Sequence, residues 1–194
     1  PWRNIDDPYR VLVSEIMLQQ TQVNRAEVKY EEFTKRFPTL KELARAPLKD
    51  VLAAWQGLGY NRRALLLHKL AQDVVRNHNG NIPREFRQLA GLPGIGKATA
   101  GSMLAFAFNK PAVFIETNIR SVFIHHFFKG KKEVSDEDIL PYVAETVDVK
   151  NPREWYYALM DYGVYLKTRF PNPSRKSKHY VRQSAFRGSD RQIR

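Results

Sequence analysis

Apolar positions recur along most of this chain at the spacing of amphipathic helices. Between Tyr60 and Asn79 they fall at i, i+3 and i+4 and form one apolar face. That face consists of Ala64, Leu67, Ala71, Val74 and Val75. Similar patterns predict helices over residues 9–20, 22–37, 39–46, 47–55 and 151–167 and helices that begin at 116 and 135. No stretch alternates strictly between apolar and polar residues, so we expect an all-α protein.

Residues that favour helix ends sharpen several of these boundaries. Thr39 and Glu42 have the spacing of a capping box, and Gly80 is expected to end the long helix that precedes it. Pro83 is expected to open the next helix, because proline suits a first helical turn. Two later helix starts are predicted from Ser135 with Asp138 and from Asn151-Pro152 with Glu154.

A Pro-Gly turn joins two of the predicted helices, which span residues 83–108 together. The turn reads Leu92-Pro93-Gly94-Ile95-Gly96-Lys97. Glycines let the backbone approach a ligand closely, and the free N–H groups of the following helix start suit an anion. With Lys97 beside them, we expect that anion to be a DNA phosphate. The alternative is an ordinary corner between helices, but the turn resembles the helix-hairpin-helix motif of DNA-binding proteins.

Composition supports a nucleic-acid partner. The 194 residues are 43% hydrophobic and carry a net charge of +12, which is typical of a globular protein that binds a polyanion. The alternative is a protein that is merely basic. No cysteine is present, which excludes disulfides, thiolate metal sites and iron–sulfur clusters. No apolar run has membrane-spanning length. We therefore expect an intracellular, monomeric protein that binds double-stranded DNA and not membranes.

Two carboxylates are candidates for chemistry. Glu15 lies among apolar neighbours, where burial would raise its pKa and suit it to act as a general acid. Glu116 follows an apolar run at a helix start, where the helix dipole would keep it ionised. One protonated acid and one carboxylate are what cleavage of a glycosidic bond requires. The alternatives are a structural glutamate paired with arginine for Glu15 and a plain helix-start acid for Glu116.

Several motifs resemble those of A/G-specific adenine DNA glycosylases, which belong to the helix-hairpin-helix superfamily of endonuclease III. The most specific run is Ser14-Glu15-Ile16-Met17-Leu18-Gln19-Gln20-Thr21-Gln22-Val23. The others are Trp2-Arg3, Asp7-Pro8-Tyr9, Trp55-Gln56-Gly57-Leu58-Gly59-Tyr60, the hairpin turn and Met160-Asp161-Tyr162-Gly163. They follow in the family's order from about Pro1 to Lys167.

The resemblance implies a two-lobed helical fold with the active site in the cleft between lobes. It predicts one lobe from residues 1–20 with 112–167 and a second from residues 21–111, which contains the hairpin. Residues 168–194 would form a basic tail, either a solvated segment or an ordered arm that contacts DNA.

The resemblance also implies residue roles. Glu15 would be the general acid that protonates adenine N7, and Glu116 takes the position of the family's catalytic aspartate. The base pocket would comprise Trp2, Arg3, Leu18 and Asp161. DNA contacts would come from Gln20, Thr21, Leu58, Tyr60, Gly94, Gly96, Lys97 and Asn118. Leu58, between two glycines, is expected to be an exposed wedge that enters the duplex. The hairpin often holds K⁺ or Na⁺ in this family, here through the backbone carbonyls of Ala90, Leu92 and Ile95.

The chain departs from the family pattern in four ways. Glu116 is one methylene longer than aspartate, so its carboxylate must retract or misalign. Ala98 stands where enzymes that also nick DNA have lysine, so no Schiff base and no lyase activity are expected. The cluster cysteines are missing, so no cofactor is required, and no counterpart of the 8-oxoguanine-reading domain is expected. These departures leave three functions open: an adenine glycosylase acting opposite 8-oxoguanine or guanine, a G:T or G:U mismatch thymine/uracil glycosylase, and a lesion-binding protein with little catalysis.

Overall fold

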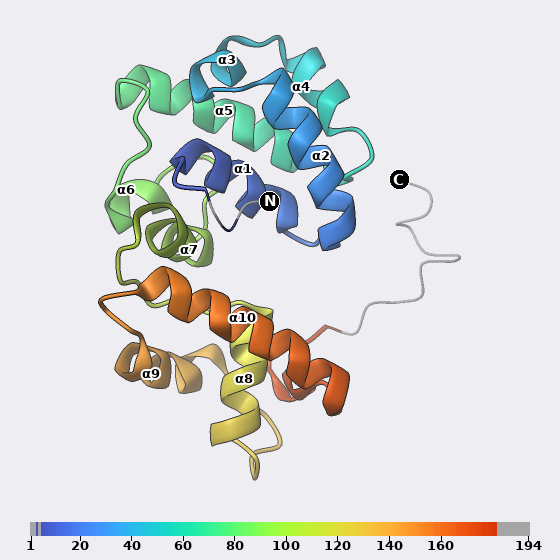
Figure 1. Ribbon diagram of the computed structural model, residues 1–194, viewed down its shortest axis with the longest axis vertical. Helices are drawn as coiled ribbons and strands as arrows, with labels where there is room; N and C mark the ends of the chain where they lie inside the picture. The colour runs from blue at the N-terminus through green and yellow to red at the C-terminus, as the bar shows by residue number, and fades with distance from the viewer. Residues whose placement is uncertain (1–2, 4, 182–194) are drawn as a thin grey trace. The chain divides into compact units, whose positions relative to one another are not determined.

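The structure is a computed structural model that describes residue 3 and residues 5–181. Trp2 and the last thirteen residues of the predicted tail, 182–194, lie outside the described residues. Within the described part, the chain forms helices and no strand, so the predicted all-α class is confirmed (Figure 1). No helix there is long and apolar enough to span a bilayer.

The chain divides into two compact units. The first comprises Pro1–Phe114 with Val147–Tyr156, and the second comprises Ile115–Thr146 with Tyr157–Arg194. This division places residues 1–20 with residues 21–111, whereas the division predicted from the sequence joined them to residues 112–167. The difference has a physical basis, since helix α1 (Pro8–Leu18) packs on helices of the first unit.

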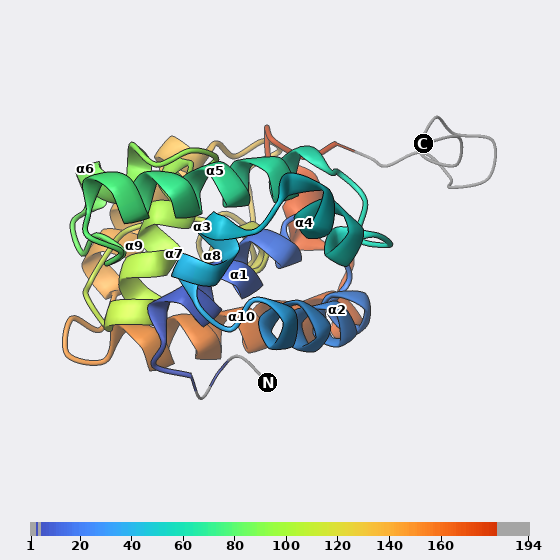
Figure 2. The same ribbon diagram turned by 90° about the horizontal axis from the view of Figure 1, so that it is seen from above.

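The first unit is built around α1. The helix contacts α2 (Val23–Arg36), α5 (Arg62–Asn77) and α7 (Lys97–Phe108), and it lies between α5 and α2 when seen from above (Figure 2). Its buried residues are Tyr9, Val11, Leu12, Val13, Ser14, Ile16 and Met17. The remaining helices of this unit are α3 (Leu40–Arg45), α4 (Leu48–Trp55) and α6 (Phe86–Ala90). A helix buried on nearly all sides fixes the residues at its end firmly in place.

Helix ends follow the predicted signals except at the first hairpin helix. The capping box of Thr39 and Glu42 is present, with Glu42 N–H donating to the Thr39 hydroxyl at 3.2 Å. Helix α6, however, begins at Phe86, not at Pro83. Ile82 and Pro83 are buried in non-helical backbone, so packing of this segment outweighs proline's preference for a first helical turn.

The second unit contains α8 (Thr117–Phe127), α9 (Asp136–Thr146), most of α10 (Pro152–Arg169) and the short 3₁₀ helix η1 (Pro173–Lys176). The predicted start at Ser135 is confirmed, because Asp138 N–H donates to the Ser135 hydroxyl at 3.2 Å and Ser135 N–H donates to Asp138 at 2.9 Å. Arg120 on α8 forms a two-pronged ion pair with Asp136, both N–O distances being 2.7 Å.

The described part of the basic tail docks on the second unit. Ser174 is buried, and its hydroxyl lies 2.6 Å from that of Ser121 on α8. Val134 N–H donates to the Lys176 carbonyl at 2.8 Å, and Lys178 N–H donates to the Val134 carbonyl at 2.9 Å. Residues 173–178 are therefore ordered against the second unit, and contact of the tail with DNA remains a prediction.

Candidate functional site

Glu15 lies on the last turns of α1, partly exposed between buried Ser14 and Ile16. The helix starts well, with Asp7 accepting from Tyr9 N–H at 2.9 Å. It ends at Leu18, which is itself half-buried. The helix thus fixes the backbone of Glu15 one turn before its end, close in the chain to Gln20 and Thr21. Its role as general acid stays a prediction.

Arg63 on α5 holds the end of α1. Its Nη1 donates to the carbonyls of Ile16 and Met17 at 3.0 Å each and to the carbonyl of Gln19. Its Nη2 donates to Thr21 Oγ1 at 3.0 Å. Because the last carbonyls of a helix lack partners within the helix, a guanidinium there satisfies them and complements the dipole. Sequence reasoning missed this residue, although an arginine just after a Gly-Leu-Gly-Tyr run was visible.

The same guanidinium fixes the Gly57–Tyr60 loop, with Nη2 donating to the carbonyls of Leu58 and Gly59 at 3.2 Å each. Leu58 is only 3% exposed, so the expectation of an exposed wedge is wrong for this structure. The loop carbonyls bind Arg63, and the Leu58 side chain turns into the core. Tyr60, by contrast, is 53% exposed.

Two non-glycine residues near Arg63 have left-handed backbone. Gln20 has φ of 55° and Tyr60 has φ of 48°. Such conformations are uncommon outside glycine and concentrate at functional sites. Both residues were predicted to contact DNA, and Arg63 lies between their loops. Its guanidinium also stacks on the rings of Trp55 and Tyr60, with 5.5 Å to each ring centre.

The hairpin turn has the backbone expected of a phosphate contact. Gly94 has φ of +81°, and a Cβ there would lie 2.9 Å from Cβ of Leu66, so glycine is required. Gly96 is the N-cap of α7 and no side chain caps this helix start. Lys97 is exposed beside it. The unoccupied space at Gly96, where a Cβ would meet nothing within 4 Å, leaves the first N–H groups of α7 approachable.

Binding of K⁺ or Na⁺ by the backbone carbonyls of Ala90, Leu92 and Ile95 remains a prediction. The Leu92 carbonyl already accepts from Ile95 N–H at 3.1 Å within the turn. The side chains of Leu92 and Ile95 are buried, whereas Gly91 and Gly94 of this segment are exposed. Among the described residues, no group of three His, Asp or Glu side chains is placed to hold a metal ion.

Glu116 is the N-cap of α8. Its Oε1 accepts from Asn118 N–H at 2.6 Å and Ile119 N–H at 2.8 Å, and its Oε2 accepts from Asn118 Nδ2 at 3.3 Å. The Glu116 side chain therefore folds back onto its own helix start, a geometry that fits both a retracted catalytic carboxylate and a plain helix cap.

Burial raises the pKa of Glu116 above its ordinary value. The two backbone N–H groups, Lys167 and Arg120 lower this pKa, but burial outweighs them. The N–H groups at the helix start lower the pKa of Glu116, as predicted. The net shift of this pKa is nevertheless upward, which is opposite to the prediction. Burial could not be judged from a helix-start pattern alone.

The remaining base-pocket candidates are distributed over both units. Arg3 is exposed in the first unit, and Asp161 is exposed on α10 in the second unit. Trp2 lies outside the described residues. Of the two candidate carboxylates, Glu15 belongs to the first unit and Glu116 to the second.

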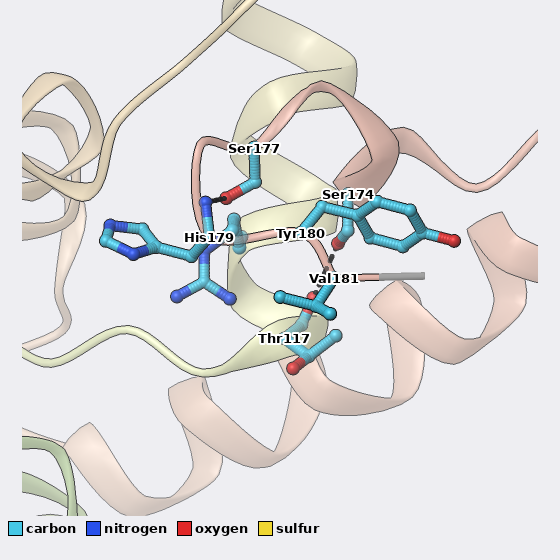
Figure 3. A pocket seen from close by; sticks show the side chains of 7 residues that line it. Thr117, Ser174, Ser177, His179, Tyr180 and Val181 are labelled. Atoms are coloured by element: carbon cyan, nitrogen blue, oxygen red, sulfur yellow. Dashed lines mark hydrogen bonds between the residues drawn. The ribbon is translucent and has the colours of Figure 1, made fainter. Parts of the chain in front are cut away.

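A pocket of about 450 Å³ lies in the second unit, and no sequence pattern indicated it (Figure 3). It is lined by Thr117, Arg120, Ser174, Ser177, His179, Tyr180 and Val181. The Ser174 hydroxyl lies 3.1 Å from the Thr117 carbonyl, and His179 N–H donates to Ser177 Oγ at 3.1 Å. Its one arginine is neutralised by Asp136, and Glu116 does not line it. Neither candidate carboxylate lines the pocket, although Thr117, the neighbour of Glu116 in the chain, does.

The all-α fold, the hairpin with an open helix start and the carboxylate fixed at a second helix start are consistent with the helix-hairpin-helix class that the sequence motifs indicate. Residues 13–140 match the family described as HhH-GPD superfamily base excision DNA repair protein, and the chain belongs to that family. The resemblance identified from the sequence motifs is confirmed.

Three similar proteins define the relationship more closely. The chain is 36% identical over 167 residues to an adenine DNA glycosylase of Buchnera aphidicola subsp. Baizongia pistaciae, covering 86% of this chain and 48% of that protein. It is 33% identical to a thymine/uracil-DNA glycosylase of Pyrobaculum aerophilum, covering 84% of this chain and 74% of that protein. A solved thermostable thymine-DNA glycosylase shares the fold, with a TM-score of 0.81, 24% identity and coverage of 91% of this chain and 82% of that chain. The chain spans about half the length of the adenine DNA glycosylases it matches.

Proposed function

We propose that this chain is a monofunctional DNA glycosylase that hydrolyses the N-glycosidic bond of adenine paired with 8-oxoguanine or guanine. The observation that carries the proposal is the Glu116 carboxylate, held by two backbone N–H groups at the start of α8. A carboxylate fixed before the reaction stabilises positive charge that develops on a sugar. The identity to adenine DNA glycosylases over most of this chain supports adenine as the base.

The proposed reaction begins with the adenine turned out of the duplex. Glu15 donates a proton to N7 of the base, the bond from C1′ to N9 breaks, and its electron pair leaves with the base. Glu116 faces the oxocarbenium ion that forms on the sugar. Water then adds to C1′ and loses a proton. Ala98 offers no amine that could attack C1′, so we propose hydrolysis without strand cleavage.

DNA is the proposed partner, bound in part through the hairpin. The open helix start at Gly96, the exposed Lys97 and the net charge of +12 all favour phosphate contacts. A K⁺ or Na⁺ ion bound by the carbonyls of Ala90, Leu92 and Ile95 would complete this contact.

A second candidate function is removal of thymine or uracil opposite guanine. It is favoured by the thymine/uracil-DNA glycosylase relative, of which the chain covers 74%, against 48% for the first adenine relative. The Gln20-Thr21 and Leu58–Tyr60 runs favour adenine instead. Both candidates use the same fold, but thymine and uracil have no N7 for Glu15 to protonate, so the base that is released separates them.

Single-turnover cleavage of duplexes that contain A:8-oxoG, A:G, T:G or U:G tests both candidates. Alkali converts each abasic product into a strand break, and omission of alkali reports lyase activity. Release of adenine without breaks in the untreated sample is the expected result. Release of thymine or uracil alone would establish the second function. Binding of a mispair without any base release would identify a lesion-binding protein.

A further inference from the structure

Helix α10 lies against the first turn of α8 at Gly163. A Cβ at Gly163 would lie 2.5 Å from the carbonyl oxygen of Asn118 and 2.8 Å from its carbonyl carbon. No other residue fits there without moving a backbone. This close approach brings the residue one turn farther along α10, Lys167, to Asn118.

Lys167, Asn118 and Glu116 form a continuous hydrogen-bonded chain. Lys167 Nζ donates to Asn118 Oδ1 at 2.7 Å, and Asn118 Nδ2 donates to Glu116 Oε2 at 3.3 Å. An ammonium has donors only and a carboxylate has acceptors only. The amide of Asn118 can therefore satisfy both neighbours in one orientation, with its oxygen toward Lys167. The lysine thus fixes which way Asn118 faces Glu116.

We propose that Lys167 is a positioning residue for Glu116, which orients Asn118 and supplies the positive charge that holds the carboxylate ionised. The inference rests on the proposed role of Glu116 in catalysis. It assigns a function to a lysine that the sequence analysis treated only as the end of a helix.

The charges around Glu116 favour this assignment. Two cations act on it, Lys167 from α10 and Arg120 from its own helix. Arg120 is bound by both oxygens of Asp136, so its charge is largely matched. Lys167 forms no ion pair with a carboxylate of the described residues, and its hydrogen bond goes to neutral Asn118. Of the two cations near Glu116, Lys167 is therefore the one that no other carboxylate pairs with.

The cost of placing Lys167 there also argues for a function. Its ammonium is half-buried, and burial lowers its pKa while Glu116 raises it. Burial raises the pKa of Glu116, and Lys167 lowers it. Each group thus stabilises the charged form of the other, as opposite charges in a partly dry site do. Without Lys167, the proton would be held more tightly by Glu116, and less of the protein would carry the carboxylate that the proposed reaction requires.

Three substitutions separate the parts of this proposal. Lys167→Met keeps the chain length and removes both donor and charge. Lys167→Gln keeps a donor for Asn118 Oδ1 and removes the charge. Lys167→Arg keeps both. Lys132→Met, at an exposed lysine of the same unit, is the matched loss of one charge.

The direct measurement is an NMR titration of the full chain with ¹³C-labelled glutamate side chains, with the Glu116 signal assigned by its loss in Glu116→Gln. The midpoint of Glu116 is expected to move to higher pH in Lys167→Met and Lys167→Gln, and to stay near the wild-type value in Lys167→Arg and Lys132→Met. A midpoint unchanged in both neutral variants overturns the proposal whether or not the protein cleaves DNA. If Lys167→Met fails to fold, the Gln and Arg variants carry the same comparison.

Single-turnover rates on the duplex that is cleaved give the functional readout. The acid limb of the pH–rate profile is expected to shift to higher pH in Lys167→Gln and to return in Lys167→Arg, with a fall of roughly tenfold on that limb and unchanged DNA binding. An inactive wild type, or a Glu116→Gln variant as fast as wild type, contradicts the proposed function and leaves the titration result standing. A uniform rate loss with no shift of the profile would reduce Lys167 to a structural residue and refute the proposal.

Discussion

Arg63 donates a hydrogen bond to the carbonyl of Leu58 at 3.2 Å, across a loop whose leucine side chain is buried. The same guanidinium donates to the end of α1, including the Met17 carbonyl at 3.0 Å. One side chain thus connects two segments that the sequence motifs assign to DNA. For Leu58 to enter a duplex, its side chain would have to leave the core while Arg63 keeps or exchanges these bonds.

Replacement of Arg63 tests this connection. Arg63→Ala leaves several carbonyls without a donor, and a loss of about 2–4 kcal/mol in the free energy of unfolding is expected. Arg63→Lys should recover only part of this loss. A single ammonium cannot bind both the end of α1 and the Gly57–Tyr60 loop as the planar guanidinium does. Urea unfolding measures both. Arg62→Ala, at the exposed neighbouring arginine, is the control and should change stability by less than about 0.5 kcal/mol. Equal effects at the two arginines would contradict the connecting role.

The two carboxylates are expected to respond differently to substitution. Glu15→Gln removes the proposed proton donor, so base release should fall by about 10²-fold or more while DNA binding persists. Glu116→Gln should also abolish most release, because the charge opposite the sugar is lost. Glu116→Asp should match or exceed wild type if the retracted glutamate is poorly placed. Single-turnover time courses on the A:8-oxoG duplex measure all three.

Other outcomes at Glu116 would change the assignment. If Glu116→Gln is harmless, Glu116 is only a helix cap and Asp161 is the next candidate for the stabilising anion. If the wild type is inert and Glu116→Asp is active, the chain is a glycosylase fold that binds lesions without turnover.

The dependence of stability on pH should show the burial of Glu116. Its folded pKa is raised, so its contribution to stability is fully present below the unfolded pKa and is lost as pH rises through the folded pKa. Glu116→Gln removes this dependence. The stability of the variant relative to wild type should therefore rise with pH from about pH 4 and level off above the folded pKa. Urea unfolding over this range measures the difference.

Asp138 offers a comparison of opposite sign. Its pKa is lowered to about 2, chiefly by the backbone N–H of Ser135 and the side chain of Lys131. Its contribution is present above the unfolded pKa and is lost as pH falls toward the folded value. Asp138→Asn relative to wild type should therefore lose stability as pH rises from about 2 to about 5. If the stability difference from wild type had the same slope against pH in Glu116→Gln and Asp138→Asn, neither slope could be assigned to the carboxyl group that was replaced.

Local signals account for the parts of the structure that were predicted correctly. Thr39 with Glu42, Ser135 with Asp138 and the Pro-Gly turn each act within a few residues, so the sequence indicates them directly. The failures have distant causes. Leu58 is buried in a loop whose carbonyls bind Arg63, and burial of the Glu116 side chain raises the pKa of that group.

In the candidate site too, the sequence indicates local features and not contacts between distant residues. Glu15, Glu116 and the hairpin were proposed from residue types in specific runs. Lys167 was not, because its contact with Asn118 spans 49 residues and depends on the absence of a side chain at Gly163. A lysine near the end of a helix has no sequence feature that distinguishes it from a solvated one.

The hairpin should act on all duplexes alike. Gly96→Val places a side chain in open space at the start of α7, where a phosphate would bind, without the left-handed strain that substitution at Gly94 would add. Affinity for matched and mispaired duplexes should fall by a similar factor, since phosphate contacts carry no sequence information. Gly130→Val, also in open space, is the matched control. Loss confined to one mispair in a fluorescence anisotropy titration would contradict the assignment.

Binding to duplex DNA should weaken steeply with salt, because a chain of net charge +12 releases counterions from several phosphates.

The basic tail can be tested separately, but the docked residues restrict where the chain is cut. Removal of everything after Lys167 would delete Ser174, which is buried against α8, and would lower stability. A stop after Val181 instead removes four arginines and one aspartate and keeps the docked segment. If those arginines contact phosphates, the slope of log affinity against log salt should become shallower while the melting temperature stays the same. An unchanged slope would show that the final residues do not take part in binding, and a lowered melting temperature would assign them a structural role.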